Sequence, residues 1–309
     1  MFKIAQPFFL RKRRTIMIKL FTDTSANLDA ALLRQQGIGV IPFSFYIDGQ
    51  ETRCTDTEQF DAKAFYDGMR RGTPVTTSQL TPQRYLDCFA PLLAAGRDIL
   101  FVGMSSGISG SYASARMAAA QLQEEFPQRK LRLVDTLSAS LGEGLQVLKA
   151  AEYRTAGIDL DTAADRLLEE RHRMCQVFTV EDLRCLRRSG RISNLKAAVG
   201  TVLQIKPMLK GDPQGQIVCF AQVRGRKKSI EVLAEQYDRY IEDAENETVA
   251  IVHADCPQEA EELARLLQRN HPPRKILTAC YEPMTGSHIG PGALALFFYG
   301  KASFRPAQK

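Results

Sequence analysis

The sequence predicts an α/β protein of two domains: an N-terminal domain built on a parallel sheet, and a smaller C-terminal domain of mixed α/β structure. The length of 309 residues suits two domains at roughly 100–200 residues each. Apolar residues make up 44% of the chain, which is enough to fill two cores and excludes a disordered or fibrous protein. Strand and helix patterns alternate along the first half, and this alternation is typical of a parallel sheet.

The first half begins with a strand pattern at 17–22 and continues to Gly157, which ends a helix. The run from Ile99 to Val102 is fully apolar, as expected of a strand covered on both faces. Asp48-Gly49 predicts a hairpin turn, because both residues tolerate positive φ. Thr81-Pro82 is typical of a helix start. Further strands are expected at 40–46 and 131–134, and helices at 28–36, 60–70, 82–95, 112–125 and 138–156.

The second half has a different order of elements. The tetrapeptide Asp212-Pro213-Gln214-Gly215 precedes a strand pattern at 217–223 and favours an antiparallel hairpin. Other strands are expected at 176–180, 248–252, 275–280 and 293–298, and helices at 160–173, 229–241 and 257–269, with a short basic helix ending at Arg188. We therefore divide the chain into a disordered basic tail (1–16), an N-terminal α/β domain (17–157), a C-terminal mixed α/β domain (158–303) and a tail (304–309).

The positive charge is concentrated at the N-terminus. The formal net charge is +6, but Lys3 and the run Arg11–Arg14 supply five positive charges before residue 17, with no acid among them. The remaining 36 basic and 35 acidic residues nearly cancel, which disfavours a nucleic-acid-binding protein. A basic arm that contacts a membrane surface is the alternative to a disordered tail for residues 1–16.

Apolar runs and cysteines exclude further classes of protein. No run reaches the roughly 18 apolar residues that a membrane span requires. The seven cysteines are scattered and form no C-x-x-C pair, which predicts thiols in a reducing cytoplasm and neither a disulfide framework nor a zinc site. The sequence also has no G-x-x-x-x-G-K-[ST] motif, so we expect it to bind no ATP.

The Ser/Gly-rich stretch from Gly103 to Ser111 is the most informative segment. It joins the apolar strand to a helix, and parallel sheets bind ligands beyond the carboxyl ends of their strands. A helix N-terminus presents unpaired N–H groups and partial positive charge, and serines add hydroxyl donors. We therefore expect an anion-binding loop for a phosphate or a carboxylate. A loop that only caps the helix is the alternative.

The same stretch matches a nucleophile motif. Gly103-x-Ser105-x-Gly107 has the G-x-S-x-G spacing of α/β-hydrolases, and His253 and His288 are candidate bases. In a hydrolase the helix starts at the serine, whereas here the flexible stretch 107–110 intervenes. A serine esterase using Ser105 is therefore the runner-up hypothesis.

Other segments also carry candidate binding groups. The hydroxyl cluster at 76–79 is expected in a loop before a helix, where it would converge with the first loop on one anion. Arg191 follows a glycine after the basic helix, and the patch at 224–228 lies on a strand-to-helix turn, where it would bind phosphate or face an acidic protein. His288 lies in the glycine-dense stretch 286–292, and we expect this loop to approach a ligand closely.

Taken together, these segments resemble the DegV family of bacterial fatty-acid-binding proteins from about Ile18 to Lys301. Ser189 and Leu80 depart from the family, which commonly has glycine and proline there. The matching motifs, in order, are Asp23-Thr24-Ser25, Thr77-Ser78-Gln79, Ser105-Ser106-Gly107-Ile108-Ser109-Gly110, Asp182-Leu183 with Gly190-Arg191-Ile192, Ile205-Lys206-Pro207, Arg224-x-Arg226-Lys227-Lys228 and Gly286-x-His288-x-Gly290-Pro291-Gly292.

The resemblance implies a carrier rather than an enzyme, with one long-chain fatty acid in a tunnel between the domains. It implies a carboxylate-binding set formed by Thr77, Ser78, Ser109, Gly110, Arg191 and His288. It further implies that the protein is the acyl-carrying subunit of fatty acid kinase, and that a separate kinase subunit makes the acyl phosphate and docks at Arg224, Arg226 and Lys227. No metal, cofactor or nucleic acid is expected, and a transient contact with a membrane surface fits this role. A sensor of a phosphate-bearing ligand is the third hypothesis.

Overall fold

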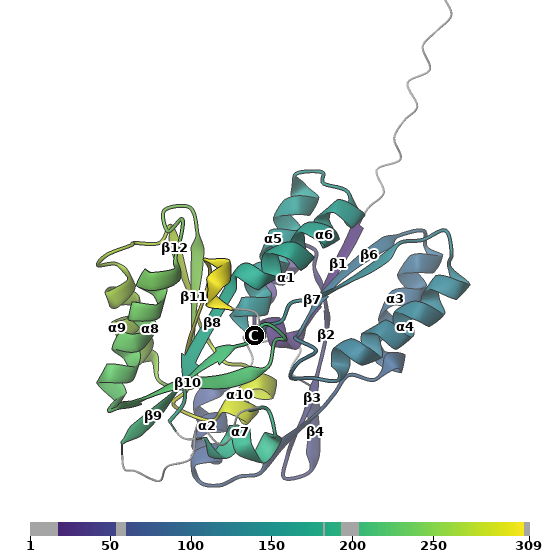
Figure 1. The fold of residues 1–309 in the computed structure, drawn as a ribbon. Coiled ribbons are helices and arrows are strands. Elements are labelled where there is room, and N and C mark those ends of the chain that lie inside the picture. Colours follow the sequence, from purple (N-terminus) through teal and green to yellow (C-terminus); the bar gives the residue numbers. More distant parts are fainter. Residues whose placement is uncertain (1–17, 54–59, 182, 193–203, 306–309) are drawn as a thin grey trace, which may run out of the picture.

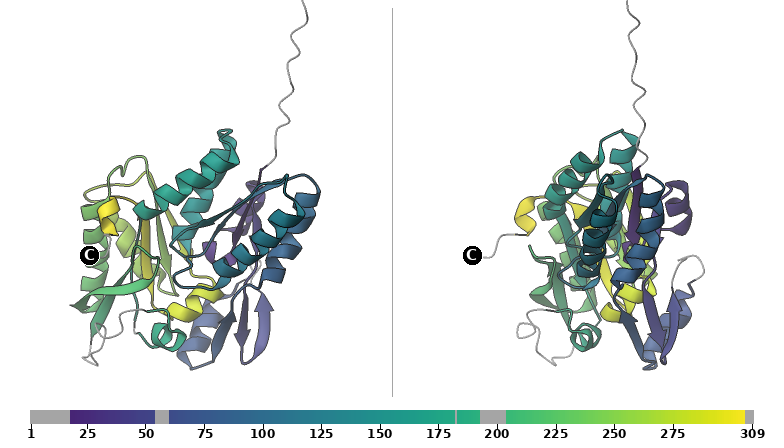
Figure 2. Two further views of the ribbon diagram at one scale, coloured as in Figure 1. Left: turned by 45° about the vertical axis from the view of Figure 1, so that its right-hand side comes forward. Right: turned by 90° about the vertical axis from the view of Figure 1, so that its right-hand side faces the viewer.

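The computed structural model describes residues 18–53, 60–181, 183–192 and 204–305. Two sheets stand side by side with helices between and outside them (Figure 1). A third, small sheet lies at one end of the molecule (Figure 2). The expected tail at 1–16 lies outside the described residues, as do residues 306–309 of the expected tail at 304–309.

The first sheet is parallel, as the alternating pattern predicted. Its strand order is β2-β1-β6-β7, and every neighbouring pair runs in the same direction. Helices α3 and α4 pack on one face, and α5 and α6 pack on the other. The central strand β6 is buried along its whole length, which confirms the prediction of a strand covered on both sides. The bounds are β1 (Ile18–Asp23), β2 (Gly39–Ile41), β6 (Asp98–Gly103), β7 (Leu131–Asp135), α1 (Ala30–Gln35), α3 (Pro82–Ala94), α4 (Ser111–Glu125), α5 (Leu141–Thr155) and α6 (Leu160–Glu170).

The second sheet is mixed, with the order β10-β9-β8-β13-β11-β12. Strands β9 and β10 form the antiparallel hairpin that the turn at 212–215 predicted, and only β11 and β12 pair in parallel. Helices α8 and α9 cover the outer face. The bounds are β8 (Met174–Thr179), β9 (Ile205–Gly211), β10 (Ile217–Arg224), β11 (Thr248–His253), β12 (Lys275–Cys280), β13 (Leu294–Tyr299), α7 (Arg184–Ser189), α8 (Arg226–Tyr240), α9 (Pro257–Leu267) and α10 (Pro283–Ile289).

The small third sheet corrects one expectation. We expected Thr76–Gln79 to lie in a loop, but β5 (Val75–Ser78) pairs antiparallel with β3 (Ser44–Ile47), which also pairs with β4 (Gln50–Arg53). The strand is too short to show the alternation by which strands are recognised in a sequence. The predicted Asp48-Gly49 turn joins β3 to β4, and both residues have positive φ. Helix α2 (Ala62–Arg70) lies between β4 and β5 in the chain.

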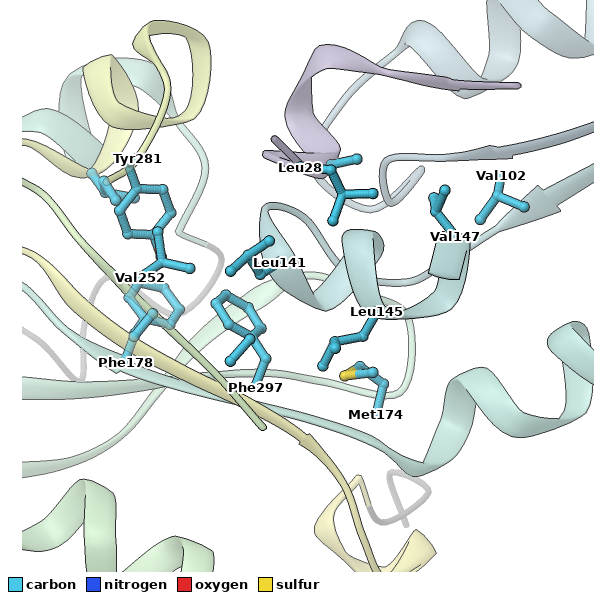
Figure 3. Packing of buried hydrophobic residues seen from close by; sticks show 14 of the residues in the cluster. Leu28, Val102, Leu141, Leu145, Val147, Met174, Phe178, Val252, Tyr281 and Phe297 are labelled. Atoms are coloured by element: carbon cyan, nitrogen blue, oxygen red, sulfur yellow. The ribbon is translucent and has the colours of Figure 1, made fainter. Parts of the chain in front are cut away.

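Helix α5 joins the two large sheets into one core. Leu141 and Leu145 point from α5 towards Phe297 and Met174 of the second sheet, while Leu28 lies on the other side of the helix (Figure 3). All five side chains belong to one buried apolar cluster. The boundary between the halves is therefore a packed helix.

The C-terminal segment packs against the second half and continues past the expected boundary at residue 303. The 3-10 turn Ala302–Phe304 is followed by Arg305, and the side chains of Phe304 and Arg305 are buried. Among the described residues, no helix is long and apolar enough to cross a membrane.

Candidate functional site

Hydroxyl groups connect two segments of the first half. One segment is the loop between β6 and α4, and the other is the end of β5. Ser109 Oγ lies 3.0 Å from Ser111 Oγ and accepts the N–H of Ser111 at 3.2 Å. Ser111 Oγ also accepts the N–H of Leu80 at 3.0 Å. The two hydroxyl-bearing segments recognised in the sequence therefore meet at the N-terminus of α4, where the helix dipole favours an anion.

Gly110 allows this close approach. A Cβ atom at Gly110 would lie 2.2 Å from Oε1 of Gln79, a distance that real contacts do not reach. A larger residue here would displace the flexible end of the Gln79 side chain. Gly110 thus contributes through the absence of a side chain.

Thr77 meets His288 across the junction of the two halves. Thr77 Oγ1 lies 2.9 Å from His288 Nε2, and the two residues are 211 positions apart in the sequence. We expected His288 in a loop, but it lies in the last turn of the short helix α10. The glycines around it concealed this helix, because they are poor helix formers. Burial lowers the pKa of His288 to about 4, helped by the positive charges of Arg191 and Arg188, so the imidazole is neutral at pH 7.

One pocket contains all of the expected head-group side chains. It has a volume of about 50 Å³, and half of the residues that line it are apolar. Thr77, Ser78 and Ser109 come from the first half, while Arg191 and His288 come from the second. The remaining lining residues are Phe43, Gln79, Met104, Ile108, Leu186, Ile217, Met284, Thr285 and Ile289.

Arg191 stands at the open side of this pocket. Gly190 ends α7 with a φ of +69°, a conformation that suits glycine and turns the chain away from the helix axis. The exposed Arg191 guanidinium then donates to the carbonyl oxygens of Ile108, at 3.4 Å, and Ser189. It also lines a shallow polar cleft of about 330 Å³ with the stretch 106–110. The guanidinium therefore lies between the pocket and solvent.

Thr285 is a lining residue that the sequence reading missed. Its buried Oγ1 has no hydrogen-bond partner among the described residues, although buried hydroxyls are normally paired. Thr285 precedes His288 by three positions on α10, so both residues lie on one face of the helix. The i, i+3 spacing was the available signal, but it requires that the helix first be recognised.

Ser105 is not placed as a nucleophile. Its side chain is buried, and its hydroxyl donates to the carbonyl oxygen of Gly215 at 2.9 Å and accepts the N–H of Gly107 at 3.1 Å. In the described part of the chain, no histidine or carboxylate is hydrogen-bonded to Ser105 Oγ. His288 is paired with Thr77, and His253 Nδ1 accepts the N–H of Cys256. This geometry argues against the esterase hypothesis, because a serine nucleophile needs a base within hydrogen-bond reach.

The basic patch divides into exposed and engaged residues. Arg224 ends β10 and Lys227 lies in the first turn of α8, and both side chains are exposed. Arg226 is instead held by both carboxylate oxygens of Glu259 and by the carbonyl oxygen of Gly292. Arg226 therefore fixes α8 against α9. Arg224 and Lys227 remain accessible, as does Lys228, whose ammonium group contacts Glu231 and Glu235.

Metal ligation finds no support in the described ranges. They contain no group of three or more histidine, cysteine or acidic residues that could hold an ion. The six cysteines in these ranges form no disulfide with one another.

Comparison with known proteins places the chain in a family. The family model described as "Uncharacterised protein, DegV family" matches residues 17–301, and the chain belongs to that family. A DegV domain-containing protein of Clostridium perfringens is 35% identical over 281 residues, covering 91% of this chain and 97% of the relative.

Solved structures agree with this assignment. A fatty-acid-binding DegV family protein from Thermus thermophilus superposes with a TM-score of 0.83 at 28% identity, over 92% of this chain and 99% of that one. DegV from Bacillus subtilis, a fatty-acid-binding protein, gives a TM-score of 0.78 at 27% identity, over 92% and 99%. The recognition made from the sequence motifs is confirmed.

Proposed function

We propose that this protein binds a long-chain fatty acid at the junction of its two halves and carries it to a separate kinase subunit. One observation carries the proposal: Thr77, Ser109, Arg191 and His288, which come from four distant segments, line one pocket whose remaining wall is mainly apolar. The solved relatives from Thermus thermophilus and Bacillus subtilis are fatty-acid-binding proteins, which supports the same ligand class here.

The pocket chemistry suits a carboxylate head. A buried carboxylate is costly unless it is hydrogen-bonded or paired. Hydroxyls of Thr77 and Ser109, the N-terminus of α4 and the Arg191 guanidinium offset that cost. Thr285 Oγ1 adds a hydroxyl that has no partner among the described residues.

Because His288 is neutral at pH 7, its position next to Thr77 has a consequence for the proton between them. If the Thr77 hydroxyl donates to a bound carboxylate, its oxygen must accept from His288. The ligand therefore selects the tautomer of His288 that carries the proton on Nε2.

The acyl tail supplies most of the affinity in this proposal. About 14 methylenes at about 0.8 kcal/mol each give on the order of 10 kcal/mol before the costs of ordering. A cavity of about 50 Å³ holds only a head group, so the apolar wall must rearrange to admit the tail. Met104 and Met284 belong to that wall, and methionine side chains repack readily.

The carrier role assigns catalysis to the partner. The acyl phosphate would form at the exposed side of the head-group pocket, where Arg191 and the cleft at 106–110 face solvent. The exposed pair Arg224 and Lys227 would meet an acidic surface of the kinase.

Extraction of the denatured protein into organic solvent tests the ligand class. Mass spectrometry is expected to find about one free fatty acid per chain. Thermal stabilisation by nucleotides or sugar phosphates, with none by fatty acids, would instead favour the phosphate sensor. Hydrolysis of p-nitrophenyl esters that is lost in Ser105→Ala would restore the esterase hypothesis.

A further inference from the structure

The turn that follows β1 connects the walls of the head-group pocket. This turn, residues 23–27, contains the 3-10 helix Thr24–Ala26 and is called here the η1 turn. Asp23 Oδ2 accepts the N–H of Met104 at 3.3 Å, and Thr24 Oγ1 accepts the N–H of Phe43 at 3.1 Å. Met104 and Phe43 both line the pocket.

The η1 turn also holds the helix that carries His288. Asn27 Nδ2 donates to the carbonyl oxygen of Cys280 at 3.0 Å, and Asn27 Oδ1 accepts the N–H of Glu282 at 3.2 Å. The Glu282 carboxylate then caps α10 by accepting the N–H groups of Met284 and Thr285. The η1 turn thus reaches both halves of the protein, and a shift of the turn would move several walls of the pocket.

One hydroxyl in this turn is shared by two buried carboxyl groups. Ser25 Oγ lies 2.5 Å from Asp23 Oδ1 and 2.5 Å from Glu143 Oε2. The side chains of Asp23 and Glu143 are 1% and 0% exposed, so water does not separate their charges. A serine hydroxyl has a single proton and can donate to only one of the two carboxyl groups. The other contact requires a proton on the carboxyl group.

The hydrogen bonds around Asp23 and Glu143 show which of these two carboxyl groups holds the proton. Asp23 accepts two backbone N–H groups, from Ser25 and Met104, and such donors favour the ionised form. Glu143 has one further partner, the hydroxyl of Thr22 at 2.9 Å. A neutral Glu143 donates to Ser25 Oγ, and Ser25 donates in turn to Asp23. This arrangement gives each of the three side chains a donor for every acceptor contact in the series.

The charges around the pair agree with this arrangement. The charged groups that act on Glu143 are Asp23 at the end of β1 and Glu282 at the start of α10, and both are acids. Tyr85 on α3 is the other titratable neighbour, and burial and the nearby acids Asp23 and Glu143 raise its pKa. Burial, Asp23 and Glu282 raise the pKa of Glu143 well above its ordinary value. Burial also raises the pKa of Asp23, but the hydrogen bonds from Ser25 and Met104 oppose the rise.

We propose that Glu143 is a positioning residue that remains protonated at neutral pH, and that its proton, shared with Asp23 through Ser25, holds the η1 turn in the geometry that the head-group pocket needs. The link to ligand binding rests on the proposed function. When Glu143 loses this proton at alkaline pH, two carboxylates compete for the single proton of the Ser25 hydroxyl. Their repulsion loosens the hydrogen bonds to the N–H groups of Met104 and Phe43.

Infrared spectroscopy of the full chain without added ligand tests the proton directly. Part of the neutral carboxylic acid absorption at pH 7 should come from Glu282, because burial raises the pKa of that carboxyl group to about 7. We expect the absorption to decrease by one carboxyl group in Glu143→Gln. Glu152→Gln, an exposed glutamate on the same helix, is the matched control and should keep the full absorption. A spectrum that is unchanged in Glu143→Gln overturns the assignment.

Hydrogen exchange tests the coupling to the pocket. In the wild type, the protection factors of the Met104 and Phe43 amides should fall about tenfold as the pH is raised through the loss of the proton, which is the effect of one weakened buried hydrogen bond. In Glu143→Gln, whose amide replaces the neutral acid, they should not fall. Equal losses in both proteins refute the coupling.

Affinity for oleic acid, measured over the same pH range, links the proton to function. We expect an alkaline loss of about tenfold in the wild type and none in Glu143→Gln. If the wild type binds no fatty acid at any pH, the proposed function fails, while the infrared and exchange results still decide whether Glu143 holds the turn.

Discussion

The hydroxyl of Thr77 lies 2.9 Å from Nε2 of His288, although the two residues belong to different halves of the molecule. Thr77 is on β5, in the small sheet, and His288 is on α10, which connects β12 and β13 of the second large sheet. This contact closes the head-group pocket, so a ligand bound there touches both halves at once. Binding should therefore depend on groups from each half, and each contribution can be measured separately.

Thr77→Val should weaken fatty acid binding while the protein remains folded. Valine keeps the branched shape and strand preference of threonine but removes the hydroxyl. The loss should be about 1–3 kcal/mol in binding free energy, because the tail still supplies most of the affinity. Displacement of a fluorescent fatty acid measures the change. Thr76→Val, at the exposed neighbouring position, is the control, and an equal loss in both variants would contradict the assignment.

His288 should make stability depend on acid pH. Its folded-state pKa is about 4, below the ordinary value of 6.5, so the unfolded chain binds a proton first as the pH falls. The contribution of His288 is therefore complete above about pH 6.5, and the free energy of unfolding should fall by up to about 3 kcal/mol as the pH approaches 4. Urea denaturation followed by circular dichroism measures this loss. His288→Asn should lack it, whereas His271→Asn, an exposed control, should retain it.

Arg224→Ala should separate ligand binding from coupling to the kinase. Arg224 is exposed at the end of β10 and does not line the head-group pocket, so affinity for fatty acid should be unchanged. Acyl phosphate formation with a fatty acid kinase subunit should fall several-fold, because a charge at a docking surface affects encounter and orientation. Arg269→Ala, in the exposed turn after α9, is the control. A variant that loses fatty acid affinity but couples normally would refute the docking role.

The sequence predicted the long elements well because their patterns are periodic. The apolar strand at Ile99–Val102 and the turn at Asp48-Gly49 follow from local rules, and the structure has both. Strand β5 and helix α10, which have four and seven residues, could not be recognised in the sequence because such short elements show no full period. Thr77 and His288 were joined through resemblance to a family, since no local rule relates positions 211 apart.

Buried polar groups were the least predictable part of the structure. Glu143 reads in the sequence as an ordinary helix residue, and Arg305 as part of a charged tail. Their burial depends on partners supplied by distant segments. Ser25 meets Glu143 across 118 positions, and Leu137 meets Arg305 across 168. Such partners become visible only when the sheets are in place.

Arg305 should be a major source of stability at the junction of the halves. Its Nη1 donates to the carbonyl oxygens of Leu137, at 2.8 Å, and Asp212, at 3.1 Å, and its Nε donates to that of Met174 at 2.8 Å. Arg305→Met keeps much of the buried volume but leaves the carbonyl oxygens of Leu137 and Met174 without these donors, while that of Asp212 still accepts the N–H of Gly215. We expect the free energy of unfolding to fall by about 3–5 kcal/mol, measured by urea denaturation with circular dichroism because the chain has no tryptophan.

The same variant should also affect the pocket. Asp212 begins the turn whose Gly215 carbonyl oxygen accepts the Ser105 hydroxyl, and a Cβ atom at Gly107 would lie 2.5 Å from the neighbouring carbonyl oxygen of Gln214. Loss of Arg305 should therefore release the turn from the loop that carries Ser109, and fatty acid should dissociate faster. Arg269→Met removes an exposed arginine and should change neither quantity. A loss of stability below about 1 kcal/mol in Arg305→Met would mean that water satisfies these carbonyl oxygens and that Arg305 does not hold the halves together.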